Sequence, residues 1–249
     1  FRWYGRFFRE RLKGFTRLYI QDEKSAALLH SIHSGQYTIC GDTRFDRVHA
    51  IARQAAPLPL LESFRGKERL VMAGSSWPPE ERIIAEYINL QPEGAKWVLA
   101  PHEIDTAHIE KLESLFTVPV VRYSRVAEND PGLFRVMIID NFGMLSSAYR
   151  YARIAIVGGG FGKGIHNILE PATWGIPVLF GPNYHRFREA HGMLEAGGGL
   201  CFRDGREFSE LMERLLSDDE ELEARSRKSL EYVRANLGAT ATILDGLTG

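Results

Sequence analysis

The stretch that most constrains this chain runs from residue 154 to residue 182, IAIVGGGFGKGIHNILEPATWGIPVLFGP. Its first four residues are an apolar run bounded by glycine, which predicts a buried parallel strand. The glycines that follow allow positive φ angles and let a ligand approach the backbone closely. Residues 166–174 predict a helix ended by Gly175, and residues 177–180 predict a second buried strand. A strand, a glycine loop and a helix N-terminus in this order are typical of a phosphate site.

The glycine spacing itself is not diagnostic. It matches neither Gly-x-Gly-x-x-Gly in a first βαβ unit nor a Walker loop, because no Gly-Lys-Ser/Thr follows. A loop that merely turns tightly is the alternative. Glu170 favours a ligand site, because it would share a helix face with His166, four residues earlier. There its carboxylate could accept hydrogen bonds from ribose hydroxyls. It also precedes Pro171, an expensive position for an ordinary helix residue.

The rest of the chain alternates strands and helices. Strands are predicted at 70–74, 97–100, 118–122, 136–139 and 199–202, and helices at 75–81, 105–115, 145–152, 187–196, 207–216 and 220–236. This rhythm predicts an α/β fold, a Rossmann-like doubly wound parallel sheet with helices on both faces. The earlier part contributes only a strand at 17–20, a helix at 22–31 and a strand at 37–40, too little for a domain. A proline-rich apolar segment at 55–60 indicates a linker.

Ligands of such sheets bind where the strands end. The polar and glycine residues predicted at that edge form the candidate nucleotide-sugar site: Gly74, Ser75, Ser76, Pro101, His102, Asp140, Phe142, Gly143, Met144, Gly159, Gly160, Lys163, Gly164, His166, Asn167 and Glu170. Several have structural alternatives: Ser75 as a helix cap, His102 as a hydrogen-bonded structural histidine, and Asp140 as the start of a turn. Their common edge favours the site.

Composition excludes several other classes. The chain has 249 residues, 44% of them hydrophobic and 25% charged, with a net charge of -1, so no nucleic-acid partner is indicated. Cys40 and Cys201 read as buried thiols. No metal-ligand spacing or Ser–His–Asp order is present, and no metal or cofactor is implied. Residues 1–13 interleave basic and aromatic side chains; a helix with its aromatic face packed inside its own domain is favoured over a helix lying on lipid.

The segments GKGIHNILEPA and GIPVLFGPNY resemble the C-terminal domain of the bacterial Kdo transferases. That family transfers 3-deoxy-D-manno-octulosonic acid (Kdo) from CMP-Kdo to the lipid A precursor (lipid IVA) in lipopolysaccharide biosynthesis, and has a GT-B glycosyltransferase fold of two Rossmann-like domains. The resemblance implies four parts: 1–55, the end of the N-terminal acceptor domain; 56–68, a linker; 69–235, the nucleotide-sugar donor domain; and 236–249, a tail.

The resemblance also implies roles for single residues. The segments from Ala73 to Ser75 and from Asp140 to Leu145 would line the CMP site, Glu170 would bind the ribose, and Asn167 would lie near the phosphate. Two departures stand out. Many members have Pro-Arg-His where this chain has Pro101-His102-Glu103. Lys163, a flexible cation beside the loop, could reach the same charge, but the sequence leaves open whether it replaces the missing arginine. Many also have Gly-Glu-Leu where this chain has Gly143-Met144-Leu145.

In the family the general base is a glutamate early in the N-terminal domain, so the catalytic base is expected outside these residues. We expect this part of the protein to be soluble and to bind donor without turnover, and the whole protein to lie at the cytoplasmic face of the inner membrane. Two alternatives stay open. One is another GT-B transferase or an epimerase that uses a UDP-sugar; the other is a catalytically silent nucleotide-binding module.

Overall fold

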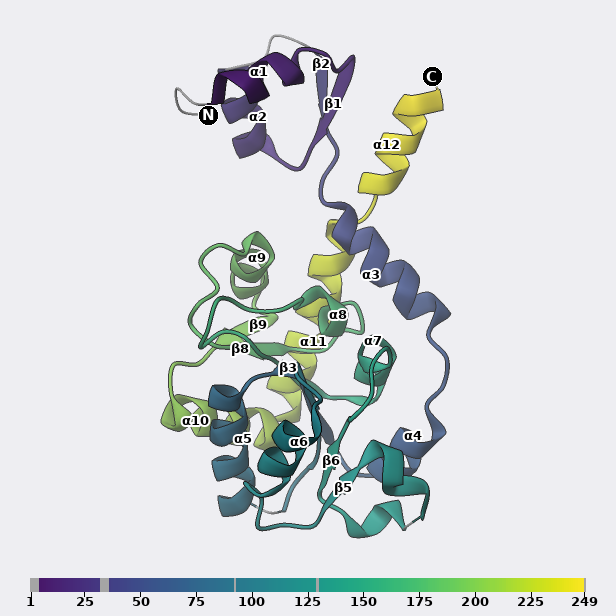
Figure 1. Ribbon diagram of the computed structural model, residues 1–249, viewed down its shortest axis with the longest axis vertical. Coiled ribbons are helices and arrows are strands. Elements are labelled where there is room, and N and C mark those ends of the chain that lie inside the picture. Colours follow the sequence, from purple (N-terminus) through teal and green to yellow (C-terminus); the bar gives the residue numbers. More distant parts are fainter. Residues whose placement is uncertain (1–4, 32–35, 92, 129, 249) are drawn as a thin grey trace. The chain divides into compact units, whose positions relative to one another are not determined.

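The computed structural model describes residues 5–31, 36–91, 93–128 and 130–248 (Figure 1). The chain divides into two compact units: Phe1–Ala50 with Ala235–Gly249, and Ile51–Arg234. We call them unit 1 and unit 2 and describe each by itself. Helices α3 (Thr43–Gln54) and α11 (Asp219–Ala235) run across the two boundaries between them.

Unit 2 is built on one seven-stranded parallel sheet. Its strands are β3 (Leu70–Ser76), β4 (Lys96–Pro101), β5 (Val120–Arg122), β6 (Val136–Ile138), β7 (Ile154–Val157), β8 (Val178–Phe180) and β9 (Gly199–Cys201). They lie in the order β5-β6-β4-β3-β7-β8-β9, and every pair is parallel. All four residues of β7 and all three of β8 are buried, which explains why these strands are unbroken apolar runs.

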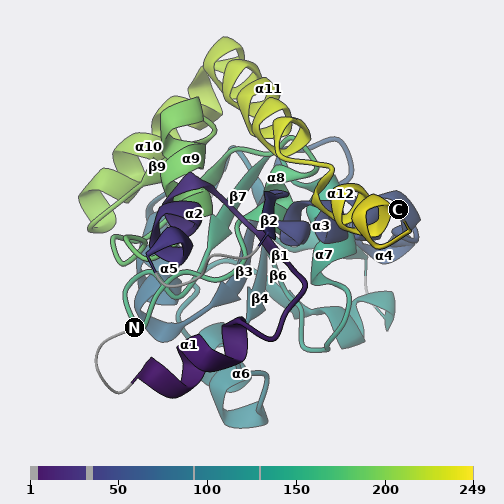
Figure 2. The same ribbon diagram turned by 90° about the horizontal axis from the view of Figure 1, so that it is seen from above.

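Helices cover both faces of this sheet (Figure 2). They are α5 (Pro78–Leu90), α6 (Thr106–Glu113), α7 (Leu145–Ala148), α8 (Leu169–Ala172), α9 (Arg188–Ala196), α10 (Gly205–Ser217) and α11. Successive strand residues point to opposite faces. Val71 and Ala73 therefore pack in one hydrophobic cluster with α5 and α10, while Leu70 and Met72 pack in a second. The predicted α/β sheet with helices on both faces is confirmed.

The segment expected to be a linker carries a helix. Helix α4 (Pro59–Arg65) contributes Leu61 and Phe64, both fully buried, to the same cluster as Leu70 and Met72. The Leu58 amide donates a hydrogen bond to the Tyr151 hydroxyl at 2.8 Å. The segment 56–68 is therefore attached to unit 2 through Leu61 and Phe64, which pack on its sheet.

Unit 1 contains two parallel strands, β1 (Arg17–Ile20) and β2 (Gln36–Ile39), with helices α1 (Arg6–Leu12) and α2 (Glu23–His30). Asp22 caps α2 as predicted, because its carboxylate accepts from the Ser25 amide. The residues expected to be a tail form helix α12 (Ala239–Thr248). It belongs to this unit, since the Asp46 carboxylate accepts from the Gly238 and Thr240 amides, each at 2.7 Å.

Helix α1 does not pack its aromatic side chains inward, contrary to the prediction. Residues 1–4 of the predicted helix lie outside the described residues. Phe7 is 60% exposed and Phe8 62% exposed, because a two-stranded sheet offers little surface to cover them. None of the described helices is both long and apolar enough to span a bilayer. Cys40 and Cys201 are free thiols, and both are only partly buried.

Candidate functional site

The candidate site lies where the strand order reverses. From β3 the chain moves outward to β4, β5 and β6 on one side, and then returns to β7, β8 and β9 on the other. In open α/β sheets this topological switch point leaves a crevice at the carboxyl ends of the two central strands. Here those strands are β3 and β7, which end in Ser76 and Val157. The Ser76 region and the glycine loop therefore meet at this edge.

Ser75 has the most unusual backbone of the site. It is the one residue other than glycine, among those described, that has a positive φ, at 50°. It lies at a register shift between β3 and β4, where Gly74 pairs with Ala100 and Ser76 pairs with Pro101. Such bulges and left-handed residues cost free energy and gather at functional sites. Ser75 is not the cap of the following helix, because α5 begins at Pro78 and has Trp77 at its N-cap.

The Ser76 hydroxyl is buried and hydrogen-bonded inside the protein. Ser76 is 2% exposed, and its hydroxyl donates to Glu81 Oε1 at 2.9 Å. His108 Nε2 lies 3.1 Å from the same carboxylate oxygen. These contacts anchor the start of α5 behind β3. Of the two serines, only Ser75 therefore stays a candidate for direct ligand contact.

Packing explains most of the glycines in the loop. A Cβ on Gly158 would lie 2.2 Å from the Ser75 carbonyl oxygen, and one on Gly160 would lie 2.5 Å from Gly181 Cα. Gly159 has φ of 90°, and its Cβ would meet the Gly164 carbonyl oxygen at 2.4 Å. The loop is therefore pressed between β3 and the loop after β8, and these three glycines serve the close approach of backbone to backbone.

Glu80 lies beneath the glycine loop and was missed by sequence reasoning. It is 1% exposed, and Oε1 accepts from the Phe161 amide at 3.3 Å, while Oε2 has no partner among the described residues. Burial raises the pKa of this carboxyl, although hydrogen bonds from the backbone at Phe161 and Gly159 oppose the shift. Part of the loop's N–H capacity is therefore already used by the protein. The only signal in the sequence is a glutamate pair in the first turn of α5.

Three aromatic rings gather at the ends of β3, β4 and β7. Trp77 stacks on His102 with ring centroids 4.5 Å apart, and His102 lies 4.6 Å from the His166 ring. The Trp77 indole N–H donates to His166 Nε2 at 2.9 Å. Burial, together with the neighbouring His102, lowers the pKa of His166. His166 is therefore neutral, and because Nε2 accepts, Nδ1 carries the proton and can donate to a ligand.

Glu170 is held by two side chains. Its Oε2 accepts from the Ser146 hydroxyl at 2.5 Å, and its Oε1 accepts from Asn167 Nδ2 at 3.0 Å. The predicted helix 166–174 is wrong in extent, since α8 spans only Leu169–Ala172. His166 and Asn167 precede it, so Glu170 and His166 do not share a helix face. Asn167 ends the loop instead, because its Oδ1 accepts from the Leu169 amide.

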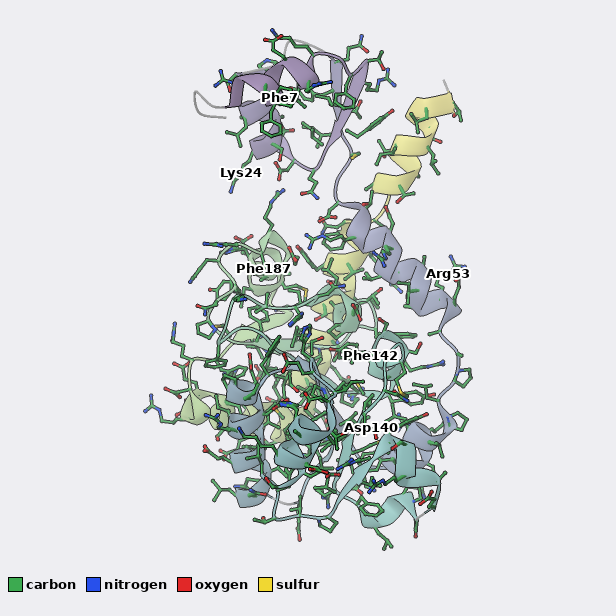
Figure 3. The ribbon with its side chains drawn as sticks, viewed as in Figure 1. Phe7, Lys24, Arg53, Asp140, Phe142 and Phe187 are labelled. Carbon is green, nitrogen blue, oxygen red and sulfur yellow. The ribbon has the colours of Figure 1, made fainter. Side chains whose placement is uncertain are left out.

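The loop after β6 contributes backbone rather than charge. The Asp140 carboxylate accepts from the Ser124 amide at 3.0 Å and from the Ser124 hydroxyl at 2.5 Å, which anchors the loop. Beyond it Phe142 is 80% exposed and Gly143 has φ of 89° (Figure 3). Met144 then leads into α7, whose Ser146 reaches Glu170. This loop is thus tied to the glycine-loop side of the crevice.

Of the other predicted site residues, two are buried in the sheet and Lys163 is exposed. Pro101 is the buried last residue of β4. Gly74 is buried against the Tyr149 ring, since a Cβ there would lie 1.9 Å from the Tyr149 hydroxyl. Lys163 is exposed on the glycine loop and lines a separate pocket, described below. No group of three or more potential metal ligands occurs in the described ranges.

The chain has relatives among known proteins. No protein-family model matches the chain. It is 33% identical over 187 residues to a 3-deoxy-D-manno-octulosonic acid transferase of Aquifex aeolicus, covering 73% of this chain and 51% of that protein. It is 27% identical over 258 residues to the transferase of the same name from Bordetella pertussis, covering 98% of this chain and 59% of that one. The chain spans about half the length of the curated relatives it matches.

Solved structures share the fold. The C-terminal CMP-Kdo binding domain of WaaA from Acinetobacter baumannii superposes with a TM-score of 0.61 at 19% identity, covering 78% of this chain and 100% of that domain. UDP-GlcNAc 2-epimerase from Neisseria meningitidis reaches a TM-score of 0.62 at 17% identity, covering 90% of this chain and 58% of that one. The GT-B-type fold is confirmed. The chain is a homologue of the bacterial 3-deoxy-D-manno-octulosonic acid transferases, as its sequence resemblance indicated.

Proposed function

We propose that this chain carries the donor site of a Kdo transferase, a glycosyltransferase that moves Kdo from CMP-Kdo to the lipid A precursor in lipopolysaccharide biosynthesis. The observation that supports it best is the topological switch point at the carboxyl ends of β3 and β7. Ser75 with its positive φ, the His166 ring that accepts from Trp77, and Glu170 held by Ser146 and Asn167 lie at or after the ends of these strands, in a chain homologous to transferases of that name. The CMP-Kdo-binding domain of WaaA has the same fold.

In this proposal the nucleotide lies along the crevice. Both Glu170 oxygens are already oriented by donors, and each keeps a lone pair for a ribose hydroxyl. His166 Nδ1–H and the Ser75 hydroxyl are the donors for the phosphate of CMP. The exposed loop from Asp140 to Met144 presents backbone groups to the edge of the base. No metal is part of the proposed site.

The reaction needs the phosphate to leave. An acceptor hydroxyl attacks the anomeric carbon of Kdo and gives its proton to a general base, which we expect outside these residues. The bond from that carbon to the phosphate oxygen breaks, and CMP departs with the electron pair. Neutral donors that are already in place stabilise the charge that develops on the phosphate, since they need no reorganisation during the step. The contribution of this chain is thus binding and charge stabilisation.

Calorimetric titration of the chain with CMP, UMP and UDP tests the donor class. We expect selective binding of CMP, weakened roughly 10- to 100-fold in Glu170→Ala because hydrogen bonds to a charged group are lost. The exposed Glu231→Ala is the matched control and should bind CMP as the wild type does. A ribose contact further predicts that wild type prefers CMP to 2′-deoxy-CMP and that Glu170→Ala does not.

Other outcomes identify other functions. Tighter binding of UDP than of CMP would assign the chain to a UDP-sugar transferase or epimerase. A folded chain that binds none of the three nucleotides would be a silent module. Binding that falls equally for CMP and 2′-deoxy-CMP in Glu170→Ala would refute the ribose role and leave Glu170 with the structural task of holding Ser146 and Asn167.

We further propose that the reaction takes place at the cytoplasmic face of the inner membrane, where a lipid acceptor would lie. Helix α1 supports such a location, because Phe7 and Phe8 are exposed beside basic residues, and the Arg11 guanidinium lies 4.9 Å from the Phe7 ring centroid. An exposed aromatic and basic helix binds anionic lipid surfaces. Flotation with vesicles of anionic phospholipid should recover the wild type and lose the Phe7→Ser/Phe8→Ser variant. Equal flotation of both proteins would refute this role of α1.

A further inference from the structure

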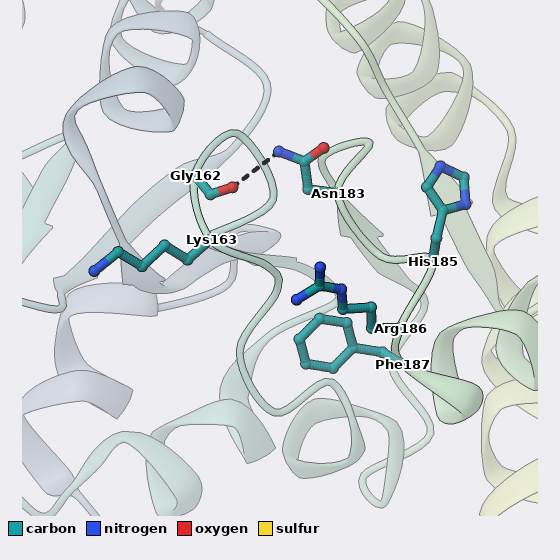
Figure 4. A pocket seen from close by; sticks show the side chains of 6 residues that line it. All are labelled: Gly162, Lys163, Asn183, His185, Arg186 and Phe187. Atoms are coloured by element: carbon teal, nitrogen blue, oxygen red, sulfur yellow. Dashed lines mark hydrogen bonds between the residues drawn. The ribbon is translucent and has the colours of Figure 1, made fainter. Parts of the chain in front are cut away.

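A second cavity lies beside the glycine loop, at the carboxyl ends of β7 and β8 (Figure 4). Its volume is about 520 Å³, and it is lined by Gly162, Lys163, Asn183, His185, Arg186 and Phe187. This volume lies within the roughly 300–1,000 Å³ of small-molecule sites. The residues come from two loops, one after each strand, so the cavity is formed only by the fold.

The walls of this pocket are firmly joined. The Asn183 amide donates to the Gly160 carbonyl, and Asn183 Nδ2 donates to the Gly162 carbonyl, both at 2.9 Å. Gly164 has φ of 134°, and a Cβ on it would lie 2.6 Å from the Phe187 ring. Hydrogen bonds and the contact of the Phe187 ring with Gly164 thus join the two loops. They keep the pocket walls at a set distance without a ligand.

The pocket is positively charged. Lys163 and Arg186 line it, and none of its lining residues is acidic. Over the part of the chain that the structure describes, neither cation makes an ion pair or a hydrogen bond through its side chain. In Figure 4 the Arg186 guanidinium lies beside the Phe187 ring, Lys163 extends from the opposite loop, and His185 points away. Arg186 beside an apolar ring, with the exposed and extended Lys163 on the facing loop, matches a sugar that carries an acid group.

We propose that Lys163 and Arg186 form an oxyanion subsite for an acidic sugar, which binds through a carboxylate or a phosphate group while the pyranose ring packs on Phe187. The proposal rests on the proposed function, because the pocket and the nucleotide crevice share the glycine loop. The donor sugar supplies a carboxylate, and a phosphorylated acceptor sugar supplies a phosphate. In either case the subsite selects acidic sugars by charge and is distinct from the contacts to CMP.

The test is an NMR titration of the chain with two probes, free Kdo and glucosamine 1-phosphate, with CMP titrated separately. The variant is Lys163→Gln/Arg186→Gln, and the matched control is Lys67→Gln/Arg82→Gln, two exposed cations outside the pocket. We expect one probe to shift the amide signals of Gly162 and Phe187. Its affinity should fall roughly tenfold or more in the pocket variant, because charge-assisted hydrogen bonds are lost. It should stay unchanged in the control.

The probe that shows this pattern identifies the source: Kdo means the donor carboxylate, and glucosamine 1-phosphate means an acceptor phosphate. The CMP affinity should stay within about twofold of wild type in the pocket variant, because the proposed subsite is distinct from the contacts to CMP. A loss of CMP affinity as large as that of the probe would overturn the proposal, because the cations would then hold the nucleotide phosphate. The proposal would also be overturned if neither probe shifted the pocket signals, or if probe affinity fell equally in the pocket variant and in the control. If the probe pattern holds but CMP does not bind, the subsite stands and the proposed function fails.

Discussion

Replacing Gly158 by alanine tests the central packing of unit 2. Gly158 is the first residue of the glycine loop, and its amide donates to the Gly74 carbonyl at 3.0 Å. A Cβ at this position would lie 2.2 Å from the Ser75 carbonyl oxygen and 2.7 Å from Ser76 Cα. Ordinary contacts begin at 3.4 Å, so β3 and the loop would have to separate by about 1.2 Å.

The neighbours cannot yield by rotating a side chain, because the atoms in the way belong to the backbone. Overpacking costs about 1–3 kcal/mol, and we expect the upper part of this range, about 2–3 kcal/mol, because Ser76 is 2% exposed and Val157 is 1% exposed. In a domain of this size each 1 kcal/mol corresponds to roughly 2–4 °C. The melting temperature of Gly158→Ala should therefore fall by roughly 4–12 °C.

The assay is thermal and urea unfolding followed by circular dichroism, with CMP titration of the folded variant. Gly162→Ala is the matched control in the same loop, since its Cβ would meet no atom closer than 3.7 Å and its φ is not positive. It should change the free energy of unfolding by less than about 0.5 kcal/mol. We also expect Gly158→Ala to weaken CMP binding, because the crevice opens at this point. Equal unfolding midpoints for the two variants would refute the reasoning.

Three further predictions concern Glu80, Ser75 and Asp46. Glu80→Gln should flatten the pH dependence of stability. Because the pKa of Glu80 is raised in the folded protein, the folded wild type keeps this proton to higher pH than the unfolded chain does, and its stability falls as pH rises above about 4.5. Urea unfolding from pH 4 to 8 measures the slope. Ser75→Gly should raise the free energy of unfolding by about 1 kcal/mol by relieving the positive φ, yet weaken CMP binding in titration; unchanged binding would count against a phosphate contact. Asp46→Asn should speed hydrogen exchange at the Gly238 and Thr240 amides. Burial raises the pKa of Asp46, but the hydrogen bonds from those amides lower it by more, so its contribution is present above about pH 3.8 and is lost as pH falls below that.

Much of the sheet could be predicted because strands that are buried on both faces consist of unbroken apolar residues. Strand β7 lies at the predicted residues 154–157, and β8 and β9 lie within one residue of their predictions. Each is covered on both faces, so each appears as an unbroken apolar run that needs no knowledge of its neighbours. The cap of α2 by Asp22 is equally local, since the hydrogen bond spans three residues.

Helix extent was harder where the chain meets other segments. Residues 166–174 have a helical pattern, yet only Leu169–Ala172 is α-helical. Before it, Asn167 Oδ1 accepts a hydrogen bond from the Leu169 amide, and His166 Nε2 accepts one from the Trp77 indole. Residues 56–68 read as a linker by their prolines, but the open face of a sheet buries Leu61 and Phe64. The distant contact is that of Trp77 in the first segment and that of the sheet in the second, and in both such contacts override local preference.

The sequence by itself determined the α/β class and the residues at the strand ends, because both follow from periodicity and from chain order. Only the tertiary structure decided what those residues do. It turned the Ser76 hydroxyl toward Glu81, placed Glu80 under the loop, and made Lys163 and Arg186, from separate loops, line one pocket. Strand order, and therefore which loops meet, depends on long-range pairing in a seven-stranded sheet. Local patterns record which side chains are buried, but they do not record which distant segment buries them.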